Sequence, residues 1–367
     1  MNYDWKLSNG YPRTKRLKVF GAFVCGGGST MGYKLAGFYH LGGIEINNRM
    51  ADIYQQNHHP KYLYREDIRL FNQREDLPQE LFDLDILDGS PPCTSFSIAG
   101  KREKHWGKAK RFKEGKAKQV LDDLVFVYCD TIAKLRPKVA LLENVRGLIS
   151  GKAKYYAMGI WERLEASGYE VQLFLLNSAT MGVPQSRERV FYIARSKDLN
   201  LPRLRLHFAE EPVRFGQIAD KGSNSHRPLW KSLLNRLPFV IKGEPNFRWA
   251  DMRYRQLAQP EAFFGSTILY DEDVPRTLTA GGSTVYWEEQ RNINATELKR
   301  MSSFPEDYDF MGADARFVCG MSVPPLMIAR IAMAIREQWF FPEQNREMHP
   351  SEIYDPEQLS FFPGMIA

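Results

Sequence analysis

The chain alternates short apolar runs with segments whose apolar residues recur at helical spacing. The apolar runs predict six strands, at Leu17–Phe23, Gly43–Ile46, Leu84–Leu87, Lys138–Leu142, Glu170–Leu176 and Val190–Ala194. One helix-like stretch ends near Ala36. Another carries a single apolar face, formed by Leu121, Leu124, Val125, Tyr128, Ile132 and Leu135. Strands and helices that alternate in this way predict a mostly parallel α/β sheet with helices on both sides.

The regular alternation is lost from about Asp198 until near Arg291, where prolines, aromatic residues and scattered arginines dominate. We interpret this region as a second, loop-rich domain. A clear helix returns at Pro325–Trp339, and after Pro342 the chain becomes polar and is interrupted by prolines. We therefore predict a large domain over residues 15–197 plus 288–340, a smaller domain over 198–287 and a tail over 341–367.

The composition is typical of a soluble globular protein, with 43% hydrophobic and 26% charged residues. No run of eighteen apolar residues is present and the first fourteen residues contain no apolar stretch, so we expect no membrane span, no signal peptide and a cytoplasmic location. Cys25, Cys93, Cys129 and Cys319 lie far apart, which argues against a disulfide framework or a structural zinc site.

The net charge of +6 is concentrated in one segment. Between Lys101 and Lys118 there are nine Lys and Arg residues against Glu103 and Glu114, a local charge of +7 that leaves the remainder near −1. Such a concentration indicates a polyanionic partner, with a solvated loop as the alternative.

A glycine-rich turn, Cys25–Thr30, connects the first predicted strand to the first helix, and Glu45 follows about twenty positions later. Glycines let backbone N–H groups approach a ligand, and the acidic residue can accept hydrogen bonds from ribose hydroxyls. The pattern is typical of a nucleoside-containing cofactor, although a purely steric role for the glycines is an equal alternative at this point.

Chemically active side chains lie at the ends of three of the later strands. Pro91 and Pro92 fix the backbone before Cys93, which is a candidate nucleophile at a strand end. Glu143 follows a second strand, and Arg187 precedes a third. A thiolate, a carboxyl group that can share a proton with a ring nitrogen, and guanidinium groups are what addition to an electron-poor pyrimidine requires, but each group alone could be structural.

Taken together, these features strongly resemble the DNA cytosine-5 methyltransferases. The matching pieces occur in the family's order, at Phe23–Gly28, Glu45, Asp67-Ile68, Pro91-Pro92-Cys93, Glu143-Asn144-Val145, Gln185-x-Arg187-x-Arg189, Arg291 to Phe304-Pro305, and Gly320 to Val323. The chain departs from the family at Cys25, where Gly is usual, at Met301-Ser302, where Leu-Gln is usual, and at Met321, where Asn is usual. The resemblance implies a Rossmann-like S-adenosylmethionine-dependent methyltransferase sheet with a second, smaller target-recognition domain.

The resemblance also implies a cofactor site and a reaction without a metal. The residues expected around S-adenosyl-L-methionine, which leaves as S-adenosyl-L-homocysteine, are Phe23, Gly26, Gly27, Glu45, Ile46, Asp67, Ile68, Pro92, Leu124, Ser322 and Val323. Cys93 is expected to add to C6 of a cytosine flipped out of DNA, and Glu143 to donate to N3. Asn144 is expected to orient the loop, with Arg187 and Arg189 holding the base and stabilising Glu143.

Double-stranded DNA is the partner that the resemblance implies, with a monomeric enzyme. The residues expected to contact DNA are Ser97, Lys101, Arg102, Lys108, Lys110, Arg111, Gln185, Arg248, Arg253 and Arg255. The stretch Arg276–Gly282 resembles the end of the family's recognition region. Two alternatives stay open: a tRNA cytosine-5 methyltransferase and a catalytically silent nucleic-acid-binding protein. The second is disfavoured because Cys93, Glu143, Arg187 and Arg189 are all retained.

The tail ends in Gln358-Leu359-Ser360-Phe361-Phe362, which resembles the pentapeptide that docks bacterial proteins onto the replicative sliding clamp. Gln358, Leu359, Phe361 and Phe362 are therefore candidate clamp-binding residues. The alternative is that the two phenylalanines pack on the enzyme's own surface.

Overall fold

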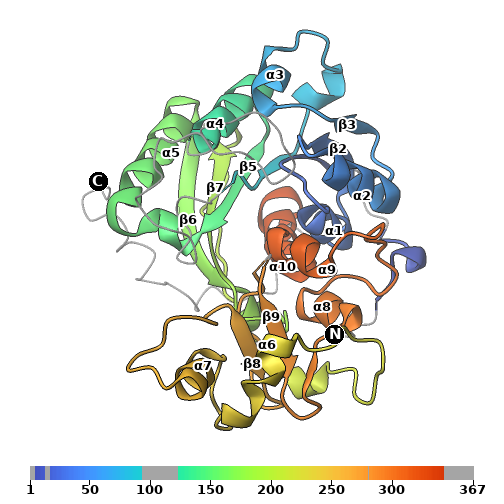
Figure 1. Ribbon diagram of the computed structural model, residues 1–367. Helices are drawn as coiled ribbons and strands as arrows, with labels where there is room; N and C mark the ends of the chain where they lie inside the picture. The colour runs from blue at the N-terminus through green and yellow to red at the C-terminus, as the bar shows by residue number, and fades with distance from the viewer. Residues whose placement is uncertain (1–4, 13–16, 93–122, 280, 343–367) are drawn as a thin grey trace. The chain divides into compact units, whose positions relative to one another are not determined.

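The computed structural model describes residues 5–12, 17–92, 123–279 and 281–342 (Figure 1). The predictions for Cys93, for the basic segment and for the clamp-like pentapeptide therefore lie outside the described residues. The chain divides into two compact units. We call Tyr11–Asn177, Glu188–Phe208 and Ile328–Ala367 the sheet unit, and Met1–Gly10, Ser178–Arg187 and Ala209–Met327 the second unit. This division does not test the predicted assignment of catalysis and target recognition to residue ranges, which stays a prediction.

The sheet unit is built on a seven-stranded sheet in the order β3-β2-β1-β4-β5-β7-β6. All neighbouring strands run parallel except β7, which is antiparallel to both β5 and β6. The bounds are Lys18–Ala22 (β1), Tyr39–Ile44 (β2), Tyr62–Tyr64 (β3), Ile86–Gly89 (β4), Val139–Val145 (β5), Tyr169–Asn177 (β6) and Glu188–Ser196 (β7). The mostly parallel, Rossmann-like sheet that the sequence predicted is confirmed.

All six predicted strands are present, although several bounds differ from the prediction. β5 ends at Val145 rather than Leu142, because its pairing with β7 continues to that residue, so Glu143 and Asn144 lie within the strand and not after it as predicted. β3 was not predicted, because its three residues are half-buried and too few to show a period. β2 begins four residues before the predicted Gly43 and ends at Ile44, so Glu45 and Ile46 lie just beyond it. The buried His40 and Gly42 interrupt the apolar run and hide its first half.

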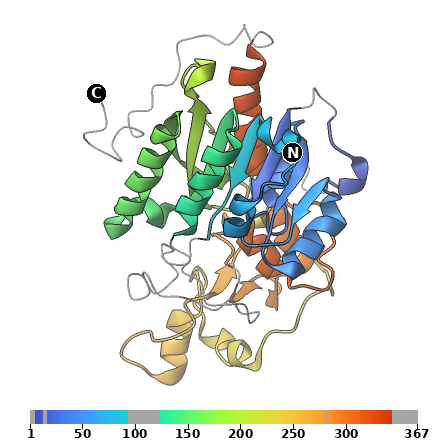
Figure 2. The same cartoon turned by 90° about the horizontal axis from the view of Figure 1, so that it is seen from above.

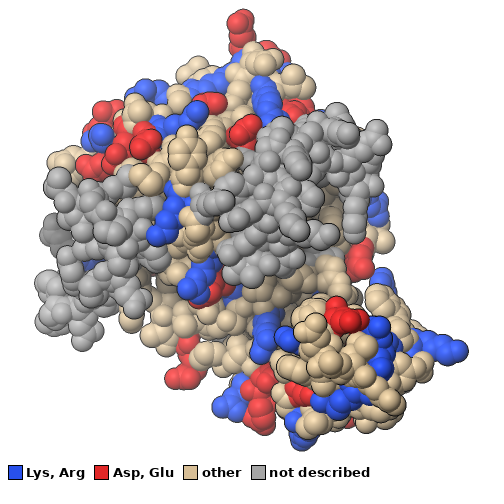
Figure 3. Space-filling model, turned by 60° about the vertical axis from the view of Figure 1, so that its left-hand side comes forward, with Lys and Arg blue, Asp and Glu red and all other residues tan. Residues whose placement is uncertain are grey.

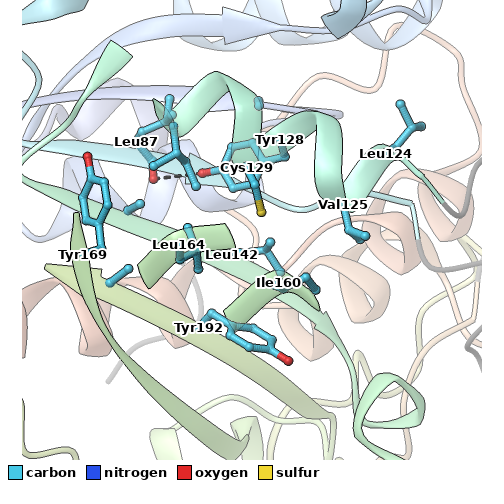
Figure 4. Packing of buried hydrophobic residues seen from close by; sticks show 14 of the residues in the cluster. Leu87, Leu124, Val125, Tyr128, Cys129, Leu142, Ile160, Leu164, Tyr169 and Tyr192 are labelled. Atoms are coloured by element: carbon cyan, nitrogen blue, oxygen red, sulfur yellow. Dashed lines mark hydrogen bonds between the residues drawn. The ribbon is translucent and has the colours of Figure 1, made fainter. Parts of the chain in front are cut away.

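Helices cover both faces of this sheet. Buried residues of α3 (Ile68–Gln73), α4 (Leu124–Leu135) and α5 (Lys154–Ala166) form one core with the sheet. Figure 4 shows Tyr128 of α4 and Ile160 of α5 in this core, where the Tyr128 hydroxyl donates to the Leu87 carbonyl at 3.0 Å. The opposite face carries α1 (Gly28–Leu35), α2 (Asn48–His58) and the C-terminal part of α10 (Pro325–Ile335) (Figures 1 and 2).

The second unit has a three-stranded sheet in the order β10-β9-β8 and short helices joined by long loops. Its elements are α6 (Lys231–Leu234), α7 (Arg248–Arg255), β8 (Ser266–Leu269), β9 (Ser283–Tyr286), β10 (Arg291–Asn292), α8 (Ala295–Met301) and α9 (Ala315–Met321). A small core around Leu233, Phe247 and Val285 holds α6, α7 and the sheet together. Beside it, the buried Arg291 bonds both carboxylate oxygens of Glu297, at 2.9 and 2.8 Å.

One helical segment near the C-terminal end of the described residues is long and apolar. Within the described residues, the segment Ala315–Phe340 is long and apolar enough to cross a membrane by length and composition alone. Since 72% of its most apolar window is buried, and a core helix of a soluble protein passes the same test, this is weak evidence for a membrane span. The expectation of no membrane span stays a prediction.

Candidate active site

Strand alternation gathers three charged residues on one face of the sheet. Leu87 and Leu142 point into the core beneath α4 and α5. Successive side chains on a strand point to opposite faces, so Asp88 on β4 and Glu143 on β5 point away from that core. Arg189 on β7 neighbours Val190 of the same core and therefore shares the face of Glu143.

Glu143 and Arg189 form an ion pair that is almost removed from water. Arg189 Nε lies 2.8 Å from Glu143 Oε1, and the two side chains are 12% and 9% exposed. The geometry is that of a charge-assisted hydrogen bond. The antiparallel pairing of β5 with β7 produces it, because the start of β7 then lies beside the end of β5.

Asn144 connects the end of β5 to the chain that leads to Cys93. Its Nδ2 donates to the Pro91 carbonyl at 3.3 Å, and its Oδ1 accepts from the Val145 N–H at 2.9 Å. The side chain is buried, so both amide ends are used within the protein. Asn144 thus anchors the backbone two residues before the predicted nucleophile.

Arg187 belongs to the second unit. Its guanidinium donates to the Gly320 carbonyl at 3.0 Å and its backbone N–H donates to Ser178 Oγ at 3.1 Å. Gly320 lies just before Ser322 and Val323 in the chain. Both of these residues are buried, and both are predicted to contact the cofactor. The buried hydroxyl of Ser322 has no hydrogen-bond partner among the described residues, as expected of a group that meets a ligand.

The glycine-rich turn between β1 and α1 has an unusual backbone. Phe23, Cys25 and Gly27 have φ angles of 60°, 47° and 81°, in the left-handed region that favours glycine. Cys25 therefore adopts the conformation for which the family's usual glycine is suited, at a cost of roughly 1–2 kcal/mol for a side chain with Cβ.

Glu45 holds the turn from the end of β2. Its Oε2 accepts from the Cys25 N–H at 2.9 Å and its Oε1 accepts from the Asn47 N–H at 2.7 Å. Glu45 therefore fixes the backbone of the turn at Cys25 and the start of α2. A buried carboxylate at this position, just after the second strand, is the type of group that accepts hydrogen bonds from ribose hydroxyls, so Glu45 fits the predicted cofactor.

Asp67, predicted as the adenine partner, is the N-cap of α3. Its Oδ1 accepts from the Arg69 N–H at 2.9 Å, and its Oδ2 lies 3.2 Å from the Arg69 guanidinium. Ile68 begins the helix and is buried. A cap of this kind could have been predicted from an Asp placed just before a helical pattern. The adenine contact stays a prediction.

Phe23 and Leu124, two apolar cofactor candidates, lie against the core beneath α4. The Phe23 ring meets Tyr128 edge to face at a centroid distance of 6.3 Å, and Leu124 begins α4 and is buried. Both residues therefore have packing roles in addition to any ligand contact.

Asp88 is a buried carboxyl group that the sequence reasoning did not single out. Only 4% of it is exposed, and the Tyr33 hydroxyl donates to its Oδ1 at 3.3 Å. Burial raises the pKa of Asp88 to about 7, an effect that the hydrogen bonds from Ser29 and Tyr33 oppose and the charge of Glu143 increases. A carboxylate inside an otherwise apolar strand was the signal that could have identified it.

The predicted DNA-contacting residues of the second unit differ in their environments. Gln185 is 1% exposed, and its amide donates to the Met301 carbonyl at 3.3 Å and accepts from the Leu278 N–H at 3.2 Å. Arg253 bonds both oxygens of Glu244 at 2.7 and 2.6 Å. Gln185 and Arg253 are thus committed to contacts within the protein.

The guanidinium groups of Arg255 and Arg248 contact different kinds of side chain. Arg255 lies 3.7 Å from Asp251 and 3.5 Å from Glu261. The Arg248 guanidinium instead lies over the rings of Trp249 and Phe264, at 4.7 and 4.8 Å from their centroids. On the face shown in Figure 3, described Lys and Arg side chains are interspersed with Asp and Glu rather than gathered in one positive patch.

Metal and disulfide chemistry find no support in the described part of the chain. No group of three or more His, Cys, Asp or Glu residues that could hold a metal ion occurs there. No disulfide bond joins Cys25, Cys129 and Cys319 within that part.

Comparison with known proteins identifies the family. Residues 18–337 match the model of the C-5 cytosine-specific DNA methylase family. The Type II methyltransferase M.FnuDI of Fusobacterium nucleatum is 34% identical, covering 92% of this chain and 100% of its own length. M.NgoPII of Neisseria gonorrhoeae is 30% identical, with 90% and 99% covered. DNMT2 of Spodoptera frugiperda shares the fold, with a TM-score of 0.60 at 16% identity over 87% of this chain and 99% of its own. The family match over nearly the whole sheet and active-site region shows that this chain belongs to the DNA cytosine-5 methyltransferases.

Proposed function

We propose that the enzyme transfers a methyl group from S-adenosyl-L-methionine to C5 of a cytosine flipped out of double-stranded DNA, through a covalent bond between Cys93 and C6. The observation that carries this proposal is the buried Glu143–Arg189 pair at the end of β5, with Asn144 anchoring Pro91 beside it. The pair supplies a carboxyl group oriented by a cation, and the anchor fixes the chain before the nucleophile.

The residues around the turn after β1 fit the cofactor. Glu45 is a buried carboxylate that holds the turn through the Cys25 N–H, and a carboxylate just after the second strand is suited to accept hydrogen bonds from ribose hydroxyls. When bound, S-adenosyl-L-methionine supplies an electrophilic methyl group. The residues proposed to hold it are Phe23, Gly26, Gly27, Glu45, Ile46, Asp67, Ile68, Pro92, Leu124, Ser322 and Val323.

The reaction is proposed to begin with the Cys93 thiolate adding to C6, which forms an S–C bond and moves electron density to C5. The Glu143 carboxyl shares a proton with N3, so that the charge entering the ring is neutralised as it develops. C5 then takes the methyl group. Transfer of the C5 proton to a water molecule restores the C5–C6 double bond and expels Cys93 as the thiolate, while the proton on N3 returns to Glu143.

Base flipping costs a few kcal/mol, which contacts to DNA must recover. We propose that the phosphate backbone of DNA is contacted by Ser97, Lys101, Arg102, Lys108, Lys110 and Arg111. Among the arginines of α7, we propose that Arg248 contacts DNA. Arg253 and Arg255 face carboxylates, whereas the Arg248 guanidinium is stacked between two partly exposed rings. The Nε of Arg248 is buried, so the two terminal nitrogens of its guanidinium are the donors proposed for a phosphate or a guanine edge.

Replacing Arg248 by Ala is expected to weaken DNA binding and to reduce the slope of log affinity against log salt by about 0.9, if it contacts one phosphate. Arg253→Ala is the matched comparison on the same helix. It breaks the Glu244 pair and is expected to lower thermal stability with the salt slope unchanged. Fluorescence anisotropy at several salt concentrations measures both slopes, and equal slopes for Arg248→Ala and the unchanged protein would exclude the phosphate contact.

Conversion sequencing of DNA from cells that express the protein tests the proposed function, with Cys93→Ser as the control. We expect 5-methylcytosine at one short sequence with the unchanged protein and none with the variant. Sequencing of tRNA from the same cells provides the contrasting arm. Methylation confined to tRNA, or equal DNA methylation with Cys93→Ser, would reject the proposal.

The biological setting is also a proposal. The relatives M.FnuDI and M.NgoPII are Type II methyltransferases, which supports a role in a restriction-modification system. We further propose a monomeric, cytoplasmic, nucleoid-associated enzyme whose Gln358–Phe362 segment binds a sliding clamp.

A further inference from the structure

Helix α2 contacts the glycine-rich turn at both of its ends. At the start, the Asn47 N–H donates to Glu45 Oε1 while the Cys25 N–H of the turn donates to Glu45 Oε2. At the other end, the ring Nε2 of His58 lies 3.2 Å from the Gly26 carbonyl oxygen. The turn is therefore held through an N–H group on one side and a carbonyl on the other.

The His58 ring is fixed within the fold. It is 5% exposed and lies against Tyr54 at a centroid distance of 4.8 Å, and the His58 carbonyl accepts from Lys34 Nζ at 3.1 Å. Burial lowers the pKa of His58 to about 3, with the nearby Lys34 acting in the same direction. The ring is consequently neutral at physiological pH. Because a carbonyl oxygen only accepts, Nε2 carries the proton of this bond.

The peptide between Gly26 and Gly27 is restrained on both edges. Its carbonyl accepts from His58, and its N–H donates to the Val24 carbonyl at 2.8 Å. A planar peptide held at both groups cannot rotate. A Cβ on Gly27 would lie 2.1 Å from His58 Nε2, so the absence of a side chain at residue 27 is what makes room for the ring.

We propose that His58 is a positioning residue for the cofactor: its hydrogen bond to Gly26 sets the orientation of the turn and of the first N–H groups of α1. This inference rests on the proposed function, because it assumes that the turn binds S-adenosyl-L-methionine. Without the bond, the Gly26–Gly27 peptide can rotate, and cofactor binding must pay for ordering it.

The test compares S-adenosyl-L-methionine binding to three variants of the full chain by isothermal titration calorimetry. His58→Phe keeps a ring but has no donor, and we expect the Kd to rise about tenfold. His58→Gln keeps an N–H donor of similar reach, and we expect most of the affinity to return. Tyr169→Phe is the control, since it removes a buried hydroxyl that donates to the Pro137 carbonyl at 2.7 Å near the start of β6. It should change the Kd less than twofold.

Steady-state kinetics provide the second readout. A positioning role predicts a higher KM for S-adenosyl-L-methionine and a small change in kcat. A general loss of folded enzyme would instead lower kcat. If His58→Phe does not fold, His58→Gln and His58→Asn replace the comparison, because the shorter amide cannot reach Gly26. Equal Kd values for these variants and the unchanged protein would overturn the inference. Failure of the unchanged protein to bind S-adenosyl-L-methionine would instead overturn the proposed function.

Discussion

Replacing Glu143 by Gln is expected to lower the rate of DNA methylation by about 10²–10⁴-fold, the range for loss of a general acid–base group. Gln can still accept a hydrogen bond from Arg189 Nε, so the local geometry should persist. It cannot give up a proton to N3 of the cytosine, and the charge that enters the ring at C6 addition is then left without compensation. Single-turnover methylation with saturating DNA and cofactor measures the chemical step directly.

Glu188→Gln is the matched control for this substitution. Glu188 pairs with Arg146 at 2.8 Å, one residue from Arg189, but both side chains of that pair are largely exposed. An exposed pair contributes about 0–1 kcal/mol, so this variant should keep both its stability and its methylation rate. If Glu143→Gln retained a rate within a few-fold of the unchanged enzyme, Glu143 would not be the proton-sharing group.

Replacing Asp88 by Asn is expected to stabilise the protein above pH 7 and to have little effect below pH 4. The folded pKa of Asp88, about 7, lies above the ordinary value of 3.8 because burial penalises the charged form. The stability associated with the neutral carboxyl is therefore fully present below the unfolded pKa and is lost as the pH rises through the folded pKa. Asn stays neutral throughout, so the difference should grow to about 4 kcal/mol at pH 8, at 1.36 kcal/mol per pKa unit.

Asp85→Asn should behave in the opposite way, which makes it a useful control. Asp85 directly precedes β4 and is also buried, but its Oδ1 lies 2.7 Å from Lys138 Nζ and its Oδ2 accepts from the Lys18 N–H at 2.7 Å. Removing its charge should destabilise the protein at neutral pH. Urea unfolding at pH 5, 7 and 8 compares the two variants, and a stability difference for Asp88→Asn that did not increase with pH would contradict the assignment of a raised pKa.

The sheet could be predicted from the sequence because its strands are continuous apolar runs between glycine and proline signals. The same pattern placed Glu143 and Asn144 just after a strand, but the polar pair hid the last part of β5, which continues to Val145. β3 and the first half of β2 could not be predicted, because a three-residue strand has no period and buried His and Gly do not look apolar.

The parts of the site that depend on tertiary burial were beyond the sequence. Gln185 and Arg253 have the residue types expected of DNA contacts, but long-range contacts with Met301, Leu278 and Glu244 use their polar atoms inside the protein. Asp67 has the type of a ligand, and its role as the N-cap of α3, which its position before a helical pattern could have indicated, was not predicted. Asp88 stands at the end of an apolar run, which is a signal in the sequence, but its raised pKa comes from desolvation and depends on the folded chain.

The reversed direction of β7 has a consequence for how such enzymes can change. In a purely parallel sheet, every side chain at the edge where the carboxyl ends of the strands meet comes from the last residues of a strand. A substitution there directly affects the loop that follows the strand. In this sheet Arg189 lies near the start of β7. A connecting segment precedes it, and the residues after it are fixed by hydrogen bonding to β5 and β6. An insertion into that connecting segment would therefore leave the Arg189 guanidinium in register with the Glu143 carboxylate, because the ladder after Arg189 sets that register.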